Sequence, residues 1–125
     1  MIVVDTSALI GALAGAQPEK PALLEIVRLR ERLLLPTLVL YEFWRGPRTQ
    51  TELSRQEALV PARTAEAFGS DQARVAAWLY AMLDRSRERE VDIAIAAHAL
   101  AAGATLWTLN HRDFADVPDL KLHGQ

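Results

Sequence analysis

The sequence contains no cysteine, which excludes disulfide bonds and thiolate metal ligands. It also lacks long apolar runs: none approaches the roughly 20 residues that a membrane-spanning helix requires. The apolar start MIVVDTSALIGALAG has no basic segment before it and is interrupted by Asp5, unlike a secretory signal peptide. We therefore expect a soluble, cytoplasmic protein with no membrane association.

Positive charge is scarce as well. The net charge is −2, and Lys20 and Lys121 are the only lysines among 14 basic residues. A negative protein does not favour nucleic acid through general electrostatics, although a local basic patch remains open. Arginine suits forked hydrogen bonds to phosphate, but a genomic preference for arginine produces the same bias.

The chain of 125 residues, half of them hydrophobic, has the size and core content of one domain, which we assign to residues 1–125. Short apolar strands alternate with helical patterns, which predicts an α/β fold: a three-layer α/β/α sandwich with a short, mostly parallel central sheet. The predicted strands are 1–5, 33–35, 105–109 and 120–122, with a brief edge strand at 59–61. The predicted helices are 7–14, 21–32, 37–45, 49–58, 70–87 and 92–102.

Two local features of these helices are also predicted. Thr6 or Ser7 is expected to cap the first helix, because short hydroxyl side chains accept from the free amides of a first turn. The segment 70–87 is amphipathic. Its side chains expected to face inward are Val75, Trp78, Leu79 and Met82.

Three acidic residues fall where hydrophobic elements should bury them. Asp5 follows the first strand, Glu42 lies within LVLYEFW, and Asp92 precedes IAIAAHAL. Sites in parallel sheets form at the carboxyl ends of strands and the amino ends of the following helices, where Asp5 and Asp92 are expected. Grouped carboxylates repel one another, and a hard divalent cation such as Mg²⁺ or Mn²⁺ removes that repulsion.

Each acid also has an ordinary structural interpretation. Asp5 can act as a helix N-cap, Glu42 can pair with Arg45, and Asp92 can complement a helix dipole. No single acid decides between the two interpretations. The hypothesis of a metal site depends on the three acids as a set.

The chain resembles the PIN-domain family in four blocks that follow one another in the family's order. IVVDTSALI resembles the opening strand and its Asp-Thr-Asn/Ser, and LPTLVLYEFWRG resembles the block with a glutamate in a helix. VDIAIAAHALAAGATLWTLNHRDF resembles the third block, Asp-x-x-Ile-Ala-Ala, then a strand, Thr-x-Asn/Asp and Asp-Phe. LKLH resembles the closing strand. The resemblance covers essentially the whole chain and is greatest to the VapC-type toxins of toxin–antitoxin pairs.

The resemblance implies a Mg²⁺- or Mn²⁺-dependent endoribonuclease that cuts RNA, forms a homodimer and is restrained by a cognate antitoxin protein. By position, Asp5, Glu42 and Asp92 match the metal-binding acids. The fourth acidic place is filled by Asn110 or, three residues on, by Asp113. Residues expected to bind substrate or orient the site are Thr6, Ser7, His111 and Arg112.

Other candidates have more than one interpretation. His98, on an alanine-rich helix, is expected to be structural rather than a general acid. Arg85, Arg87 and Arg89 precede Asp92 and are expected to form a solvated helix end, with an RNA-phosphate track or antitoxin contact as the alternative.

Aromatic residues surround Glu42 in its helix. Tyr41, Phe43 and Trp44 are expected to pack in the core or a dimer rather than to stack on bases. This helix and the segment 23–27 are expected to form an exposed apolar groove. In toxins of this kind, such a groove receives an antitoxin helix.

Competing functions are weighed against the same residues. A phosphoryl-receiver domain needs a lysine after a later strand, and no lysine lies between Lys20 and Lys121. A haloacid-dehalogenase phosphatase needs Asp-x-Asp, but Thr6 and Ser7 follow Asp5. A PIN-like binding module without catalysis remains the alternative, as does a nuclease that acts on DNA.

Overall fold

A parallel sheet forms the centre of the computed structural model, which describes residues 1–14, 20–28 and 31–124. Its strands lie in the order β2-β1-β3, with bounds Ile2–Val4 for β1, Leu33–Leu34 for β2 and Thr105–Trp107 for β3. Ile2 pairs with Leu33 on one side and with Thr105 on the other. The central strand is an unbroken apolar run because helices cover both of its faces.

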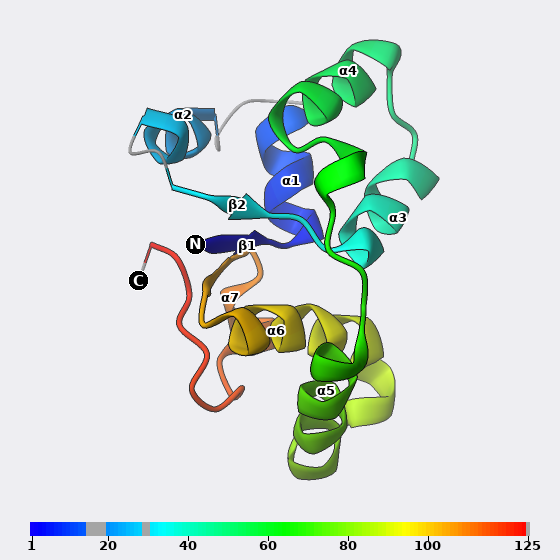
Figure 1. Cartoon of the computed structure of the whole chain (residues 1–125), viewed down its shortest axis with the longest axis vertical. Coiled ribbons are helices and arrows are strands. Elements are labelled where there is room, and N and C mark those ends of the chain that lie inside the picture. The colour runs from blue at the N-terminus through cyan, green and yellow to red at the C-terminus, as the bar shows by residue number, and fades with distance from the viewer. Residues whose placement is uncertain (15–19, 29–30, 125) are drawn as a thin grey trace.

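Helices cover both faces of this sheet, as Figure 1 shows. The α-helices are α1 (Thr6–Leu13), α2 (Lys20–Arg28), α3 (Thr37–Arg45), α4 (Gln50–Leu59), α5 (Ser70–Met82), α6 (Glu90–Ala102) and α7 (His111–Phe114), with 3-10 helices η1 (Ala62–Thr64) and η2 (Ser86–Arg89). In that view α1, α3 and α4 lie on one side of the sheet, and α5 and α6 lie on the other. The predicted α/β/α sandwich is confirmed.

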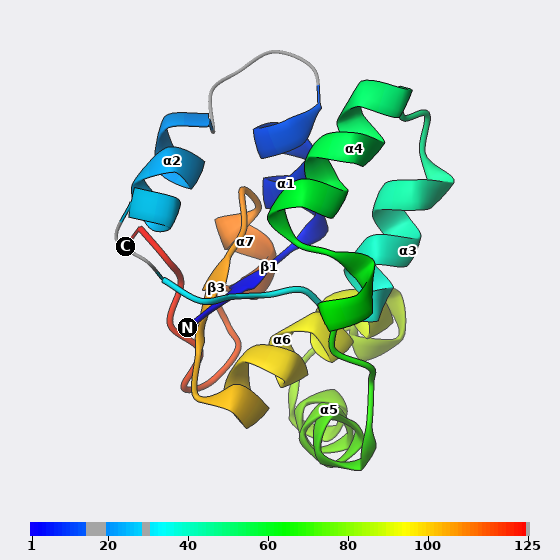
Figure 2. The same ribbon diagram turned by 45° about the horizontal axis from the view of Figure 1, so that its top comes forward.

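The alanine-rich helix α6 lies at the heart of the packing. Ile95, Ala96 and Ala99 are fully buried, because the helix packs on the strands β1 and β3 and also against α5. A helix that is apolar on every side is the expected sequence signature of such a position. Figure 2, turned toward the top of the molecule, shows α6 between α5 and the strands.

Several predicted boundaries agree closely with the structure. The helix expected over 37–45 is α3. The helix expected over 49–58 is α4, which begins with a capping box: Glu52 N–H donates to Thr49 Oγ1 at 3.1 Å and Thr49 N–H to Glu52 Oε1 at 2.8 Å. Gly103 ends α6 with a φ of 63°, a conformation that glycine adopts without strain.

The long helix predicted over 70–87 is too long. Helix α5 ends at Met82, and Arg85 takes a left-handed φ of 55° before η2 begins. Leu79 is fully buried as expected, but Trp78 and Met82 are 49% and 51% exposed. The apolar side chains of α5 span a wider face of the helix than the one that α6 covers, so some of them remain at the surface.

The helix predicted over 21–32 also ends early. Helix α2 is described as far as Arg28, and residues 31 and 32 are not helical. The intervening residues 29 and 30 of this prediction lie outside the described part of the chain.

Three strand predictions need correction. No strand forms at 59–61, because Leu59 still belongs to α4 and Pro61 leads into η1. The strand expected at 120–122 is reduced to one bridge between Leu106 and Leu122. The strand expected over 105–109 ends at Trp107, and the short helix α7 that follows soon after was not expected.

The N-cap prediction is also wrong. Asp5 occupies the N-cap position of α1, and its side chain makes no capping hydrogen bond. Thr6 and Ser7 are the first helical residues, and their hydroxyls bond elsewhere. No helix within the described ranges is long and apolar enough to cross a membrane.

Candidate functional site

A buried carboxylate lies where the central strand ends. Asp5 follows β1 and is 4% exposed. Its Oδ2 accepts hydrogen bonds from Ser7 Oγ at 2.9 Å and from Thr108 Oγ1 at 2.7 Å. The backbone amides of Leu109 and Asn110 in turn donate to these two hydroxyl oxygens, each at 3.0 Å. Uncharged hydroxyls therefore fix the orientation of Asp5 without neutralising it.

Glu42 reaches the same edge of the sheet from α3. Thr6 Oγ1 donates to Glu42 Oε1 at 2.6 Å, which joins α3 to the first turn of α1. The other oxygen, Oε2, accepts from Arg45 Nη2 at 3.3 Å. The ion pair considered as the structural interpretation of Glu42 is present, but Arg45 is exposed and such pairs contribute little to stability.

Asp92, in the first turn of α6, is repelled electrostatically by the other acids. Its pKa is raised from 3.8 to about 6, first by burial and then by the negative charges of Asp5, Asp113 and Glu42, while Arg89 opposes the shift. Residues from β1, α3, α6 and α7 thus contribute to one negative potential. Repulsion of this kind favours either a proton or a cation.

A cleft of about 490 Å³ opens beside Asp92. It is lined by Asp84, Arg85, Glu88, Arg89, Asp92, Arg112, Asp113 and Asp116. Asp113 therefore faces this space, and its charge acts on Asp92. Asn110 is exposed and does not line the cleft; its contact with the site is the backbone bond to Thr108.

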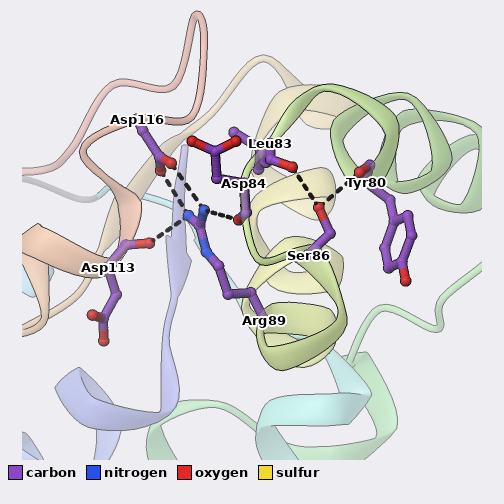
Figure 3. A network of polar contacts seen from close by, with 7 residues as sticks. All are labelled: Tyr80, Leu83, Asp84, Ser86, Arg89, Asp113 and Asp116. Carbon is purple, nitrogen blue, oxygen red and sulfur yellow. Dashed lines mark hydrogen bonds and ion pairs between the residues drawn. The ribbon is translucent and has the colours of Figure 1, made fainter.

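A single guanidinium organises the outer wall of this cleft, as Figure 3 shows. Arg89 donates to both carboxylate oxygens of Asp116, at 2.9 and 2.6 Å, and to the backbone oxygens of Asp113 at 3.0 Å and Asp84 at 3.1 Å. These hydrogen bonds raise the pKa of Arg89 and lower that of Asp116. The solvated helix end expected for the arginines here is wrong for Arg89, whose side chain is 18% exposed.

The donor set suits a hard cation, although it is not preassembled. Within the described ranges, no three acid or histidine side chains form a ready metal-binding group. Asp5 and Glu42 instead bond to hydroxyls and Arg45. The oxygen-only chemistry and the raised pKa of Asp92 both fit Mg²⁺ or Mn²⁺, because such a cation relieves the repulsion that burial of these carboxylates creates.

Of the remaining sequence candidates, Arg112 lines the cleft, whereas His111 and His98 do not. His111 begins α7 and is half-buried. Arg112 lines the cleft and is exposed; in the described part of the chain its guanidinium makes no hydrogen bond or ion pair. His98 is fully buried, and its Nδ1 lies 2.5 Å from Glu66 Oε1, which agrees with the structural role expected for it.

The roles of two residues of this site were not predicted from the sequence. Thr108 holds Asp5 from a position 103 residues away, and its signal in the sequence is the Thr-x-Asn/Asp motif, in which it is the threonine. Arg89 lies in a run of alternating charges, where nothing in the sequence distinguishes it from Arg85 or Arg87.

The predicted apolar groove is in fact two separate grooves. One, of about 390 Å³, lies between α1, α2 and α4 and is lined by Ala12, Leu13, Leu23, Leu24, Arg55, Ala58 and Leu59. The other, of about 650 Å³, is lined by Thr37, Leu40, Tyr41, Trp44, Arg45 and Ala62. Phe43 packs in the core as expected, whereas Tyr41 and Trp44 are exposed.

Comparison with known sequences gives one family and a curated relative. The family described as PIN domain matches residues 2–120. Ribonuclease VapC19 from Mycobacterium tuberculosis is 33% identical over 124 residues, which cover 97% of this chain and 98% of that protein.

Solved structures with the same fold include three at low sequence identity. VapBC2 from Rickettsia felis, bound to a DNA fragment from its promoter, has a TM-score of 0.70 at 22% identity and covers 98% of this chain and 97% of its own. FitAcB from Neisseria gonorrhoeae has a TM-score of 0.72 at 18% identity, covering 98% and 96%. DNA-bound VapBC from Salmonella typhimurium has a TM-score of 0.72 at 19% identity, covering 97% and 95%.

Proposed function

The chain belongs to the PIN-domain family as a VapC-type member, and from this premise we propose that it is a divalent-metal-dependent endoribonuclease. Residues 1–125 act as one catalytic domain. The protein serves as the toxin of a type II toxin–antitoxin pair and works in the cytoplasm. The name of its curated relative and the negative potential of the cleft support this proposal.

One observation carries the chemical part of the proposal. The carboxyl group of Asp92 is half-buried, and its pKa rises to about 6, first because of this burial and then because Asp5, Asp113 and Glu42 add their negative charges. A protein that used these acids only for folding gains nothing from this repulsion. A site for a hard cation requires it, because carboxylate charge is what attracts Mg²⁺ or Mn²⁺.

Asp5, Glu42 and Asp92 are the proposed metal ligands. For the fourth position Asp113 is preferred over Asn110, since Asp113 lines the cleft and its charge acts on Asp92. Asp113 also carries a full negative charge, whereas an asparagine offers only an amide oxygen. Asn110 then contributes through its backbone bond to Thr108.

The protein's own groups prepare the reaction. Bound in this site, Mg²⁺ or Mn²⁺ supplies charge neutralisation at the phosphate and activation of the attacking water. Ser7 and Thr108 orient Asp5, and Thr6 orients Glu42. Hydrolysis in line leaves a 5′-phosphate and a 3′-hydroxyl.

Substrate RNA is held by groups on α7. Arg112 presents beside the acids a guanidinium that makes no hydrogen bond or ion pair with the described residues, which suits a phosphate on either side of the scissile bond. His111, at the start of the same helix, is the second proposed RNA contact.

A cognate antitoxin and a second copy of the chain are the proposed protein partners. The solved structures with this fold are described as VapBC and FitAcB complexes, which supports an antitoxin. The grooves beside α2 and α3 are apolar enough to receive a helix from it. A homodimer is proposed from family membership and is tested by sedimentation of the purified protein.

The decisive experiment compares RNA cleavage by the wild type and Asp92→Asn with Mg²⁺, Mn²⁺ or EDTA. We expect cleavage that needs metal and falls on the order of 100-fold in the variant, because the charge that attracts the cation is lost. Asp71→Asn removes an equal charge from an exposed position on α5 and should cut normally. Undiminished cutting by Asp92→Asn rejects the proposed site.

The alternative function, a PIN-like module that binds RNA or protein without cleaving it, is favoured by one observation. The described carboxylates do not form a ready metal-binding group. Folded wild type that binds RNA but cuts neither single-stranded nor hairpin RNA with any metal supports this alternative. A parallel DNA panel tests whether DNA is the substrate instead.

A further inference from the structure

The short helix α7 needs an external attachment to stay in the cleft wall. It has only four residues, and so it makes few hydrogen bonds within itself. It carries Asp113, with Asp116 just after it, on a cleft that Asp92 and Asp84 also line. Phe114 and Val117 anchor this segment in the core, but the like charges of Asp113 and Asp92 repel across the cleft, so a polar contact that offsets the repulsion adds stability at the wall.

Arg89 makes that contact. Its guanidinium bonds both oxygens of Asp116 and the backbone oxygen of Asp113, which lie in and after α7. A further bond reaches the backbone oxygen of Asp84, on the opposite wall. A planar guanidinium with five donors in a fixed fork suits such bridging, and a lysine does not.

The choice of acceptors on α7 is informative. Arg89 neutralises the carboxylate of Asp116 but takes only the backbone carbonyl of Asp113. Figure 3 shows the Asp113 carboxylate pointing away from Arg89. The contact therefore fixes the position of Asp113 and leaves its charge available.

The base of Arg89 is itself held in place. The one hydroxyl proton of Ser86 is shared between Tyr80 O at 2.7 Å and Leu83 O at 2.9 Å, which ties η2 to the end of α5 (Figure 3). Arg89 is the last residue of η2 and lies three residues before Asp92. Because the base of Arg89 is held at the start of α6, its side chain fixes the position of α7 relative to α6.

We propose that Arg89 is a positioning residue that clamps α7 to the amino end of α6 and so holds the Asp113 carboxylate opposite Asp92. The catalytic consequence rests on the proposed function, but the clamp itself does not. Its four hydrogen bonds give Arg89 a different role from that of Arg112. The guanidinium of Arg89 already binds groups of the protein, whereas that of Arg112 is available for phosphate.

The test uses Arg89→Gln, Arg89→Lys and Asp116→Asn, with Arg74→Gln as the control. Arg74 is exposed and pairs with Asp71 on α5, away from the cleft. Hydrogen exchange in EDTA should show amides of residues 111–117 exchanging at least ~10-fold faster in Arg89→Gln, with β1 and α5 unchanged. Asp116→Asn keeps the bond to Asp113 and should give a smaller increase, as should Arg89→Lys.

Two further readouts separate positioning from other roles. Mn²⁺ affinity, measured by titration calorimetry, should fall about 10-fold in Arg89→Gln, a size typical of lost supporting contacts around a metal site. In RNA cleavage kcat should fall while KM changes less than about 3-fold. Arg112→Gln should do the reverse, raising KM with unchanged Mn²⁺ affinity.

Three results overturn the proposal. Unchanged exchange of 111–117 in both Arg89→Gln and Asp116→Asn means that no clamp exists. Faster exchange throughout the molecule means that Arg89 only stabilises the fold. A raised KM with unchanged kcat means that Arg89 binds RNA directly. If wild type neither binds Mn²⁺ nor cuts RNA, the proposed function fails, and the exchange result still decides the clamp.

Discussion

Two regions on either side of Asp92 hold their side chains by different chemistry: the buried surroundings of Asp5, called the floor below, and the outer wall of the cleft. At the floor, the hydroxyls of Ser7 and Thr108 orient the buried Asp5. At the wall, the guanidinium of Arg89 fixes α7 through Asp116 and a carbonyl. Both arrangements leave one carboxylate without a charged partner, that of Asp5 in one case and that of Asp113 in the other.

The difference between them follows from solvent exposure. A guanidinium next to buried Asp5 would cancel the charge that a cation needs, whereas neutral hydroxyls do not. At the half-exposed wall, water screens the charges. An ion pair can therefore hold α7 in place with little cost in desolvation. Hydrogen bonds from uncharged hydroxyls therefore suit the buried floor, and an ion pair suits the solvent-exposed wall.

The floor should be the more sensitive region. Thr108→Val removes the donor to Asp5 and the acceptor for the Asn110 amide, so we expect a loss of about 1–3 kcal/mol in unfolding free energy. Cleavage should fall about 10–100-fold, as for other contacts that support metal ligands. Urea unfolding and RNA cleavage measure both effects. Thr105→Val, at the other end of β3, is the control, and equal effects from both would contradict this prediction.

At the wall, Asp113 and Asn110 should differ sharply. Asp113→Asn removes the carboxylate that faces the cleft and should lower kcat about 10-fold. Asn110→Ala removes an exposed side chain and should change kcat by less than about 2-fold. Steady-state kinetics with Mn²⁺ measure both. The reverse ranking would assign the fourth position to Asn110.

Asp92 lies between floor and wall and should make stability depend on pH. Its folded pKa of about 6 exceeds the ordinary value of 3.8, so its stabilising contribution is complete below pH 4 and is lost as pH rises through 6. In EDTA, Asp92→Asn should therefore be more stable than wild type at pH 8. We expect about 1–2 kcal/mol, reduced from the full shift because the group is half-exposed. Thermal unfolding at pH 3.5 should show no such gain.

Salt should weaken the wall more than the floor. The Arg89→Gln variant should lose about 0.5–1 kcal/mol at low ionic strength, and this difference should shrink in 1 M NaCl, where the Debye length is about 3 Å. The loss caused by Thr108→Val involves neutral groups and should stay constant. A salt-independent loss in Arg89→Gln would mean that packing of its aliphatic stem, and not its charge, matters.

The sequence predicted the parts of this site that short-range patterns encode. Asp5 was located by the apolar strand before it, and Asp92 by the helix after it. The contacts of Thr108 and Arg89 were not predicted, because their partners lie 103 and 27 residues away and no local periodicity indicates such a contact. Trp78 and Met82 were wrongly placed inside for a related reason: a helix pattern does not tell how wide a stripe its neighbour covers.

The order of the strands also has a consequence for the time at which the site forms. The central strand β1 is synthesised first, yet β3 is its neighbour in the sheet and comes near the end of the described chain. A nascent polypeptide that already displays Asp5 and Glu42 lacks Thr108, Arg112 and Asp113, and their late arrival must close a loop of about 100 residues. The site is therefore complete only after Asp113 has been translated and β3 has joined the sheet.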